Sequence, residues 1–194
     1  MLGLRLVCLG LVIAIFATFT SPTAAAPVSA PGSAPAPAPG PVDTAIDFAK
    51  QNARELGLTG SDVNNVIVSS TVEDADTGTT HVYLQQTHKG IGVHAGLLTV
   101  NVAKAGWVIS AGHRFVPNLA AAAAGQNKIR ADEAAGVVAK HIGKDPKGIA
   151  LVQGGSGPSQ KSVLSAGGIA ASPIAAQLVW QPLDSGAARL AWHV

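Results

Sequence analysis

Six histidines are the residues of this sequence with the greatest capacity for metal binding or acid–base chemistry. They are His81, His88, His94, His113, His141 and His193. None is followed by Glu, so the chain lacks His-Glu-x-x-His, the pattern that places two zinc ligands and a general base on one helix. His81 and His88 are seven positions apart and would point to opposite faces of one strand. With no carboxylate or thiolate at ligand spacing, we expect no metal-ligating residue in this chain.

Motifs for nucleophilic catalysis and phosphate binding are also missing from the sequence. It contains no Gly-x-Ser-x-Gly elbow, no phosphate loop and no Cys-x-x-Cys. Residues 154–158 (GGSGP) have the composition of a phosphate-binding loop but lack its Lys and the following helix, which favours a flexible loop. Asp74 and Asp76 could bind calcium weakly, although solvated turn residues explain them better. We therefore expect no catalytic residue, no cofactor-binding residue and no cofactor in this chain.

The balance of charge excludes a further class of function. The chain has 13 Lys and Arg against 11 Asp and Glu, a formal net charge of +2. Nucleic-acid binding requires a clustered basic surface that displaces counterions from phosphates. We expect no nucleic-acid partner.

The first 26 residues have the pattern of an export signal. Arg5 precedes an apolar run of about 14 residues, and residues 21–26 (SPTAAA) are small enough for signal peptidase. A membrane-spanning helix needs about 20 residues, so a removed signal is favoured over a stable membrane anchor. Residues 27–41, rich in Pro and Ala, are typical of an extended linker. The sequence thus predicts a secreted, extracellular protein, and its one cysteine, Cys8, lies within the signal.

The pattern between residues 42 and 118 predicts a helix followed by antiparallel strands. Asp43 or Thr44 could cap the helix, and Gly57 is placed to end it. Strands are expected at 66–72, 79–88, 96–102 and 107–115, with a short extended link at 91–93. Short turns exclude parallel crossovers, so the helix should lie across one face of an antiparallel sheet.

Alternation along these strands predicts which side chains are buried. Trp107, Ile109, Ala111, His113 and Phe115 share one face of the last strand, which we interpret as the buried face, with His113 satisfied and partly buried at the sheet rim. In the 79–88 strand neither face is cleanly apolar. Part of that strand should therefore contact something other than the core.

A second, smaller unit is expected at 130–194, after an Ala-rich connector at 119–129. A helix at 131–143 would have Arg130 at its N-cap position, and strands are expected at 149–152, 174–182 and 187–194. Residues 154–172 indicate a long Gly/Ser-rich loop, mobile or functional. The predicted fold class is α+β, with two tandem helix-on-antiparallel-sheet (cystatin-like) units.

One segment, residues 68–91, has the pattern Ser-Ser, then Gly-x-Thr-His-x-Tyr-Leu-x-Gln-Thr, then a Gly turn. Its motif positions are Gly78, Thr80, His81, Tyr83, Leu84, Gln86, Thr87 and Gly90. This pattern closely resembles the propeptide motif of fungalysins, the secreted M36 zinc metalloproteases. Residues 98–102, 108–110 and 115–118 are similar to later strands of the same pro-region, and 190–194 to the last strand of its PepSY-like part. The resemblance covers roughly 42–194 and makes 42–118 the propeptide-motif unit and 130–194 the PepSY-like unit.

The resemblance implies a partner and a role. The partner would be an M36-type zinc metalloprotease catalytic domain, in cis or in trans, whose folding the pro-region assists and whose active site it blocks. Zinc would belong to that domain only. For the motif residues, a structural role in strand and turn geometry and direct contact with the protease stay equally open.

Two departures from the family pattern leave alternatives open. Residues 92–95 (GVHA) replace a more apolar, Asn-containing link, and the sequence ends where a precursor would continue into its catalytic domain. The chain is therefore a separate pro-domain, the N-terminal fragment of a protease precursor, or a degenerate secreted structural protein.

Overall fold

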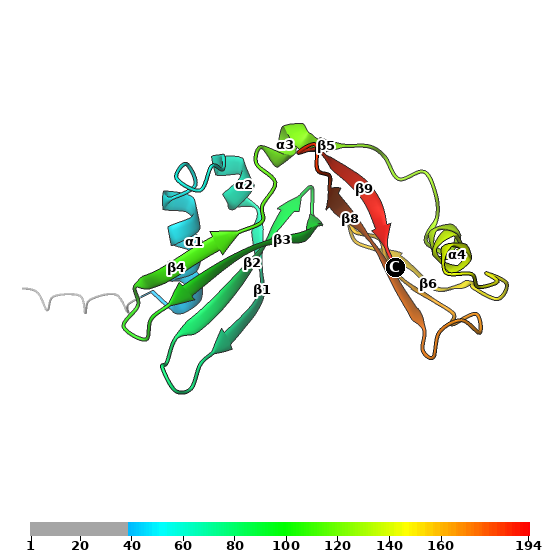
Figure 1. Ribbon diagram of the computed structural model, residues 1–194, viewed down its shortest axis with the longest axis horizontal. Helices are drawn as coiled ribbons and strands as arrows, with labels where there is room; N and C mark the ends of the chain where they lie inside the picture. The colour runs from blue at the N-terminus through cyan, green and yellow to red at the C-terminus, as the bar shows by residue number, and fades with distance from the viewer. Residues whose placement is uncertain (1–38) are drawn as a thin grey trace, which may run out of the picture. The chain divides into compact units, whose positions relative to one another are not determined.

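The computed structural model describes residues 39–194 (Figure 1). The predicted signal and nearly all of the predicted linker lie outside these residues. Its helices are α1 (Pro41–Gln51), α2 (Gly60–Asn64), α3 (Leu119–Ala122) and α4 (Ala131–His141). Its strands are β1 (Val66–Glu73), β2 (Thr80–His88), β3 (Ile91–Val102), β4 (Val108–His113), β5 (Ala123–Ala124), β6 (Leu151–Ser156), β7 (Lys161–Leu164), β8 (Ile174–Pro182) and β9 (Ala188–His193). The predicted α+β class is confirmed.

The strands of the described residues join into one mixed sheet rather than two separate antiparallel sheets. Strands β1 to β4 pair antiparallel in sequence order, and β6, β7, β8 and β9 also pair antiparallel. Parallel pairing joins β3 to β8 at Val93 and Trp180, and β5 to β9. Short turns exclude parallel neighbours in sequence, but they place no limit on strands that meet from distant parts of the chain. The cystatin-like likeness of the two halves and the boundaries at 42, 118 and 130 stay predictions.

Helix α1 lies across β2, β3 and β4, as expected, and buries Ala45 and Ala49 against them (Figure 1). Its N-cap is Gly40 rather than Asp43 or Thr44, because Pro41 has the backbone angle required at the first helical position and the helix starts there. Helix α1 is also shorter than predicted. The backbone N–H and the side-chain amide of Asn52 both donate to the Phe48 carbonyl. The chain then continues in turns rather than in regular helix up to Gly57.

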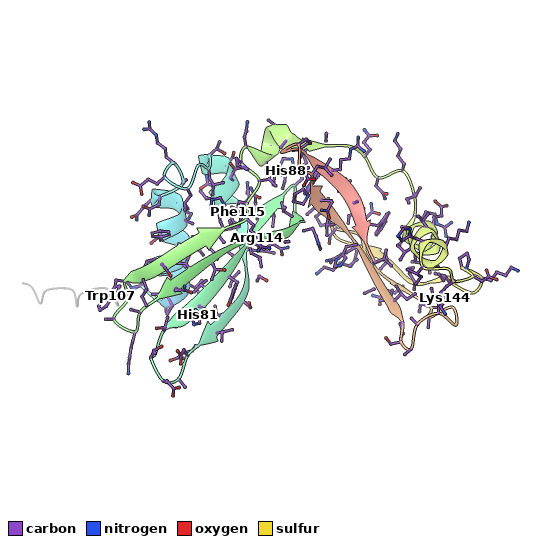
Figure 2. The ribbon with its side chains drawn as sticks, in the orientation of Figure 1. His81, His88, Trp107, Arg114, Phe115 and Lys144 are labelled. Carbon is purple, nitrogen blue, oxygen red and sulfur yellow. The ribbon has the colours of Figure 1, made fainter. Side chains whose placement is uncertain are left out.

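Strand β4 contradicts the predicted burial. Trp107 and Ile109 are 63% and 54% exposed, whereas Val108 packs against the core with Ala111 and Phe115. The register explains the difference, since Val102 pairs with Val108 while Asn101 pairs with Ser110, leaving Ile109 as an extra residue. This bulge reverses the alternation beyond it, and Trp107 lies exposed at the end of the strand (Figure 2).

A second bulge joins two predicted segments into one strand. The expected link at 91–93 and strand at 96–102 are both part of β3. Gln85 pairs with Leu97 but Thr87 pairs with Gly92, so several β3 residues oppose a single β2 residue there. Ala95 has a positive φ of 54° within this bulge. The extra residues interrupt the alternation of buried and exposed positions, so the pattern predicts two segments instead of one strand.

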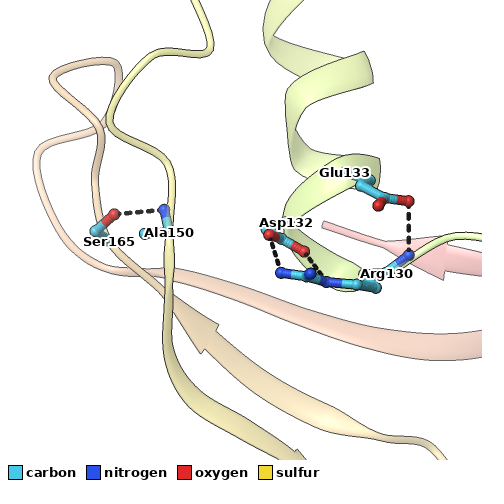
Figure 3. Close-up of polar contacts among 5 residues, drawn as sticks. All are labelled: Arg130, Asp132, Glu133, Ala150 and Ser165. Carbon is cyan, nitrogen blue, oxygen red and sulfur yellow. Dashed lines mark hydrogen bonds and ion pairs between the residues drawn. The ribbon is translucent and has the colours of Figure 1, made fainter.

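Helix α4 packs on β7 and β8 through Ala131 and Ala135. Arg130 is its N-cap residue, as predicted, and its backbone N–H donates to the Glu133 carboxylate at 3.2 Å (Figure 3). The Arg130 guanidinium pairs with Asp132 at 2.5 Å, which holds a negative carboxylate in the first helical turn.

The predicted loop at 154–172 is wrong over its first part, where β6 and β7 lie, whereas residues 165–172 contain no helix or strand. Residues 151–164 form the β6–β7 hairpin, whose turn uses positive φ at Gly157 and Gln160. The Ser165 hydroxyl accepts from the Ala150 N–H at 2.8 Å (Figure 3). It also donates to the Gly148 carbonyl at 2.6 Å, and the two bonds connect the end of β7 to the start of β6. Gly and Ser therefore supply turn geometry and backbone bonds here, which their composition alone did not distinguish from a loop.

Candidate functional site

The eight motif residues lie on β2 or in the turns that flank it. Leu84 and Gln86 point into the core on the side of α1, and both are fully buried. His81, Tyr83 and Thr87 lie on the other face and are half-buried. Gly78 and Gly90 have φ of 66° and 75° in the turns before and after the strand. The structure thus brings the motif together as one strand with its two turns.

His81 begins a polar row across three strands. Its Nδ1 lies 2.7 Å from Asn101 Oδ1, and Asn101 Nδ2 donates to Ser110 Oγ at 2.8 Å. An amide oxygen only accepts, so Nδ1 carries the proton in this bond. His81 and His88 lie near opposite ends of β2 (Figure 2). The row stabilises strand pairing on the exposed face of the sheet.

Gln86 holds the segment that leaves β4. Its Nε2 donates to the Val116 carbonyl at 2.9 Å, and its Oε1 accepts from the Val116 N–H at 2.8 Å. Both partners are buried, so the amide satisfies two backbone groups that no strand pairs. Because neither face of β2 is cleanly apolar, we expected part of the strand to contact something other than the core. For Gln86 that contact is with the backbone of Val116 in the same chain.

Asp62 holds the same segment from α2, and sequence reasoning missed it. Asp62 is 2% exposed, and its carboxylate accepts from the Thr59 N–H and hydroxyl at 2.9 and 2.7 Å. It also accepts from the backbone N–H groups of Asn118 and Leu119 at 2.8 and 2.9 Å. Burial opposes ionisation, but the hydrogen bonds outweigh it and lower the pKa of Asp62. The Thr59-x-x-Asp62 spacing of a capping box was the available signal.

The remaining sequence candidates are structural in this geometry. His113 is satisfied, as predicted: Nε2 lies 2.9 Å from the Leu56 carbonyl, and Nδ1 accepts from the Phe115 N–H at 3.1 Å. In the β1–β2 turn, hydrogen bonds from the Thr77 hydroxyl and the Asp76 N–H lower the pKa of Asp74. Within residues 39–194, no three His, Cys, Asp or Glu side chains are grouped as metal ligands. Nor does any helix there have the length and apolarity to cross a membrane.

Gly90 gives a direct test of why the motif has glycine after β2. We expect Gly90→Ala to lower the free energy of unfolding by about 2–3 kcal/mol, because a Cβ there would lie 2.8 Å from Pro158 Cγ at a φ of 75°. Gly106→Ala is the matched control. Its φ is also positive but nothing lies within 4 Å, so it should cost only about 1 kcal/mol. Urea denaturation measures both, and equal losses would show that contact with Pro158 has no role.

Strand β1 is the most exposed part of this region. It forms one end of the strand order and pairs only with β2 among the described strands. Seven of its eight residues are exposed, including Ile67, Val68 and Val72 at 53%, 42% and 53%. An unpaired edge with apolar side chains is a surface that proteins ordinarily protect.

Comparison with known families identifies this region. Residues 64–115 match the family model described as the fungalysin/thermolysin propeptide motif. The matched span includes β1 to β4 and all eight motif positions. It confirms the resemblance to a fungalysin-family propeptide over these residues. No curated protein matches the chain significantly.

Proposed function

We propose that this chain, with a protease-propeptide motif at its centre, is a secreted pro-domain of a fungalysin-type (M36) zinc metalloendopeptidase. It binds the catalytic domain, assists its folding and inhibits it, without a catalytic centre of its own. The observation that carries the proposal is the match of residues 64–115 to the propeptide motif. The export pattern of residues 1–26 supports secretion alongside such a protease.

The exposed edge of β1 supports binding to another protein. Within residues 39–194 β1 has a strand on one side only, so a strand of the partner's own sheet could pair with its other side, while Ile67 and Val72 would be buried on one face. Glu73 is the only charged residue of β1, so the edge carries little charge against pairing. This edge belongs to the matched propeptide motif, which is why we propose the contact here rather than at β6.

The packing of the β1–β4 sheet against α1 supports inhibition. An inhibitor that becomes ordered only on binding has a lower affinity, because the ordering costs conformational entropy. A binding surface that is already ordered is therefore favoured. Leu84, Leu98 and Val100 are fully buried beneath α1, and Asp62 and Gln86 hold the segment that leaves the sheet. The β1 edge is thus presented on a packed support.

An inhibition assay tests the proposal. The chain from residue 27 onward should inhibit a fungalysin-type protease with a Ki below about 1 μM, the range of specific protein complexes. It should also raise the yield of active protease on refolding. No inhibition at concentrations far above the protease would contradict the proposal and leave a degenerate structural protein as the better account.

Substitutions on the two exposed edge strands locate the contact. Ile67→Lys with Val72→Lys should weaken inhibition at least about tenfold, since burying two added charges costs more than about 1.4 kcal/mol. Val152→Lys on β6, at a position 68% exposed, is the matched control and should leave Ki unchanged. Loss of inhibition with Val152→Lys alone would move the contact to the second half.

Sequencing the transcript beyond the codon for Val194 distinguishes action in cis from action in trans. An open frame leading to His-Glu-x-x-His would make the chain the front part of a protease precursor. A stop codon would make it a pro-domain that acts on a separate protease.

A further inference from the structure

Two histidines from distant parts of the sequence lie beside each other in the fold. His94 is on β3 and His193 is on β9, and the centroids of their imidazole rings are 5.2 Å apart. Both residues are exposed, so an ion in solution can reach them. The spacing of histidines along single strands predicts no metal ligand, but it carries no information about a pair contributed by two strands that meet only in the fold.

The distance between the two rings is the distance expected for imidazoles that share one metal ion. A zinc ion lies about 2.0–2.1 Å from a coordinating imidazole nitrogen, and therefore about 3.2 Å from the centre of that ring. Two rings on one tetrahedral ion consequently have centroids about 5.2 Å apart. The planes of the His94 and His193 rings are inclined at 63°, so the rings are not stacked. Rotation about the side-chain bonds can direct one nitrogen of each ring toward a shared ion.

The ring nitrogens of this pair are free of competing partners within the protein. Over residues 39–194, no hydrogen bond joins the imidazole of His94 or His193 to another residue, whereas Nδ1 of His81 and both ring nitrogens of His113 are hydrogen-bonded. A neutral imidazole offers one nitrogen lone pair to a metal ion. An ion bound by the pair would therefore displace water and no protein group.

Paired strands position the backbone on both sides of the pair. Val93, adjacent to His94, is fully buried and pairs with Trp180 of β8. His193 pairs with Gln177 of the same strand. Ligands whose backbone is already positioned lose less conformational entropy when an ion binds.

The bulge in β3 places His94 at the surface. Ala95 follows it with a φ of 54°, and a Cβ added at Gly96 would lie 2.7 Å from Val93 Cβ, so the backbone turns tightly between these residues. Bulges redirect side chains, and unusual backbone conformations are often retained where a side chain has a function. The conformation of this segment thus accompanies an exposed side chain capable of coordination.

The charges near the pair indicate which class of ion it would bind. Lys161 lines the hollow that contains His193, and no Asp or Glu of the described chain lines that hollow. Ca²⁺ and Mg²⁺ prefer carboxylate and carbonyl oxygens, so they would find a positive charge and no carboxylate there. Imidazole nitrogen is instead a preferred ligand of zinc, copper and nickel. The surroundings favour a divalent transition metal.

We propose that His94 and His193 form a surface site for one divalent transition-metal ion, with the two imidazoles as its protein ligands and water in the other positions. The structure groups no three His, Cys, Asp or Glu side chains as ligands within residues 39–194, so the site is an open one. The bound ion links β3 to β9, close to the single residue pair that joins β3 to β8. The inference concerns this chain alone and does not rest on the proposed function.

Calorimetric titration of the untagged chain with Cu²⁺, Ni²⁺ and Zn²⁺ at about pH 7.5 tests the proposal. One ion should bind per chain, and Cu²⁺ should bind most tightly, as divalent metals generally do with nitrogen ligands. A chelator should remove the ion and restore the metal-free titration. Ca²⁺ and Mg²⁺ should give no binding at the same concentrations, because the pair offers no oxygen ligand.

Glutamine variants identify the ligands. His94→Gln and His193→Gln each remove one of the two imidazoles and should each weaken Cu²⁺ binding at least about tenfold. His141→Gln, exposed near the end of α4, is the matched control and should bind as wild type. Urea denaturation without metal checks that the variants are folded, and substitutions at these exposed positions should leave the midpoint unchanged.

Amide hydrogen exchange distinguishes an ion held by both strands from an ion held by one. Saturating Zn²⁺ should slow exchange in peptides covering 91–95 and 189–193 of the wild type, because the ion holds β3 and β9 together. Peptides covering 131–141 in α4 should exchange equally with and without Zn²⁺.

Four results would overturn the proposal. One is the absence of saturable Cu²⁺ binding below about 100 μM. Another is unchanged affinity in either His94→Gln or His193→Gln, because that side chain would then not be a ligand. The third is an equal loss of affinity in His141→Gln, which would indicate unspecific binding by surface histidines. The fourth is unchanged exchange in either 91–95 or 189–193 when Zn²⁺ is added.

Discussion

Replacing Asp62 by asparagine should lower the free energy of unfolding by about 3 kcal/mol at neutral pH. The carboxylate accepts four hydrogen bonds while almost fully buried, and three of them end on Oδ2. An amide has one oxygen, so at least one buried N–H of Asn118 or Leu119 would face an N–H₂ group instead of an acceptor. Urea denaturation measures the loss, and a loss of less than about 0.5 kcal/mol would contradict the assigned role.

Asp47→Asn is the matched control for this prediction. It makes the same change of side chain at an exposed position of α1, where we expect an effect within about 0.5 kcal/mol.

The pH dependence of Asp62→Asn should differ from wild type in acid. Because the folded state lowers the pKa of Asp62, its stabilising contribution is complete above about pH 4 and is lost as the pH falls through the folded-state pKa. The variant should lack this part of the acid slope. Denaturation curves between about pH 2 and 5 measure it, and an identical slope would show that Asp62 titrates alike in both states.

Replacing Gln86 by methionine should cost about 2–4 kcal/mol. Methionine has a similar length but no hydrogen-bonding amide, so the N–H and the carbonyl of Val116 would be left buried without their partner. The amide proton of Val116 should then exchange faster with solvent than in the wild type.

Gln51→Met, at an exposed position at the end of α1, controls for the change of residue type and should be close to neutral. If Gln86→Met unfolds at the same urea concentration as the control, the Gln86–Val116 contact contributes nothing measurable.

Local patterns in the sequence predicted the parts of the fold that depend on neighbouring residues. The β2 strand, its glycine turns and the approximate position of α1 follow from alternation, turn chemistry and helical spacing over a few residues. The propeptide motif was recognised for the same reason, since its positions all lie on one strand and its turns.

The predictions were wrong where one extra residue shifts the alternation of buried and exposed positions, or where hydrogen-bond partners are far apart in the sequence. Ile109 is an extra residue in β4, and alternation counted through it assigns Trp107 to the wrong face. Asp62 and Gln86 bind segments 56 and 30 residues away, so no local pattern reveals their partners. The Gly and Ser residues of the β6–β7 hairpin fit a turn and a loop equally well until strand pairing is known.

The two contacts that hold residues 116–119 also determine an order of events as the chain is made. Asp62 and Gln86 leave the ribosome well before their partners, and contacts of long sequence separation form late because closing long loops is slow. Until residues 116–119 are synthesised, both side chains are without those backbone partners. We therefore expect the first sheet to assemble in a loosely held form that tightens only once the connection to the second half has emerged.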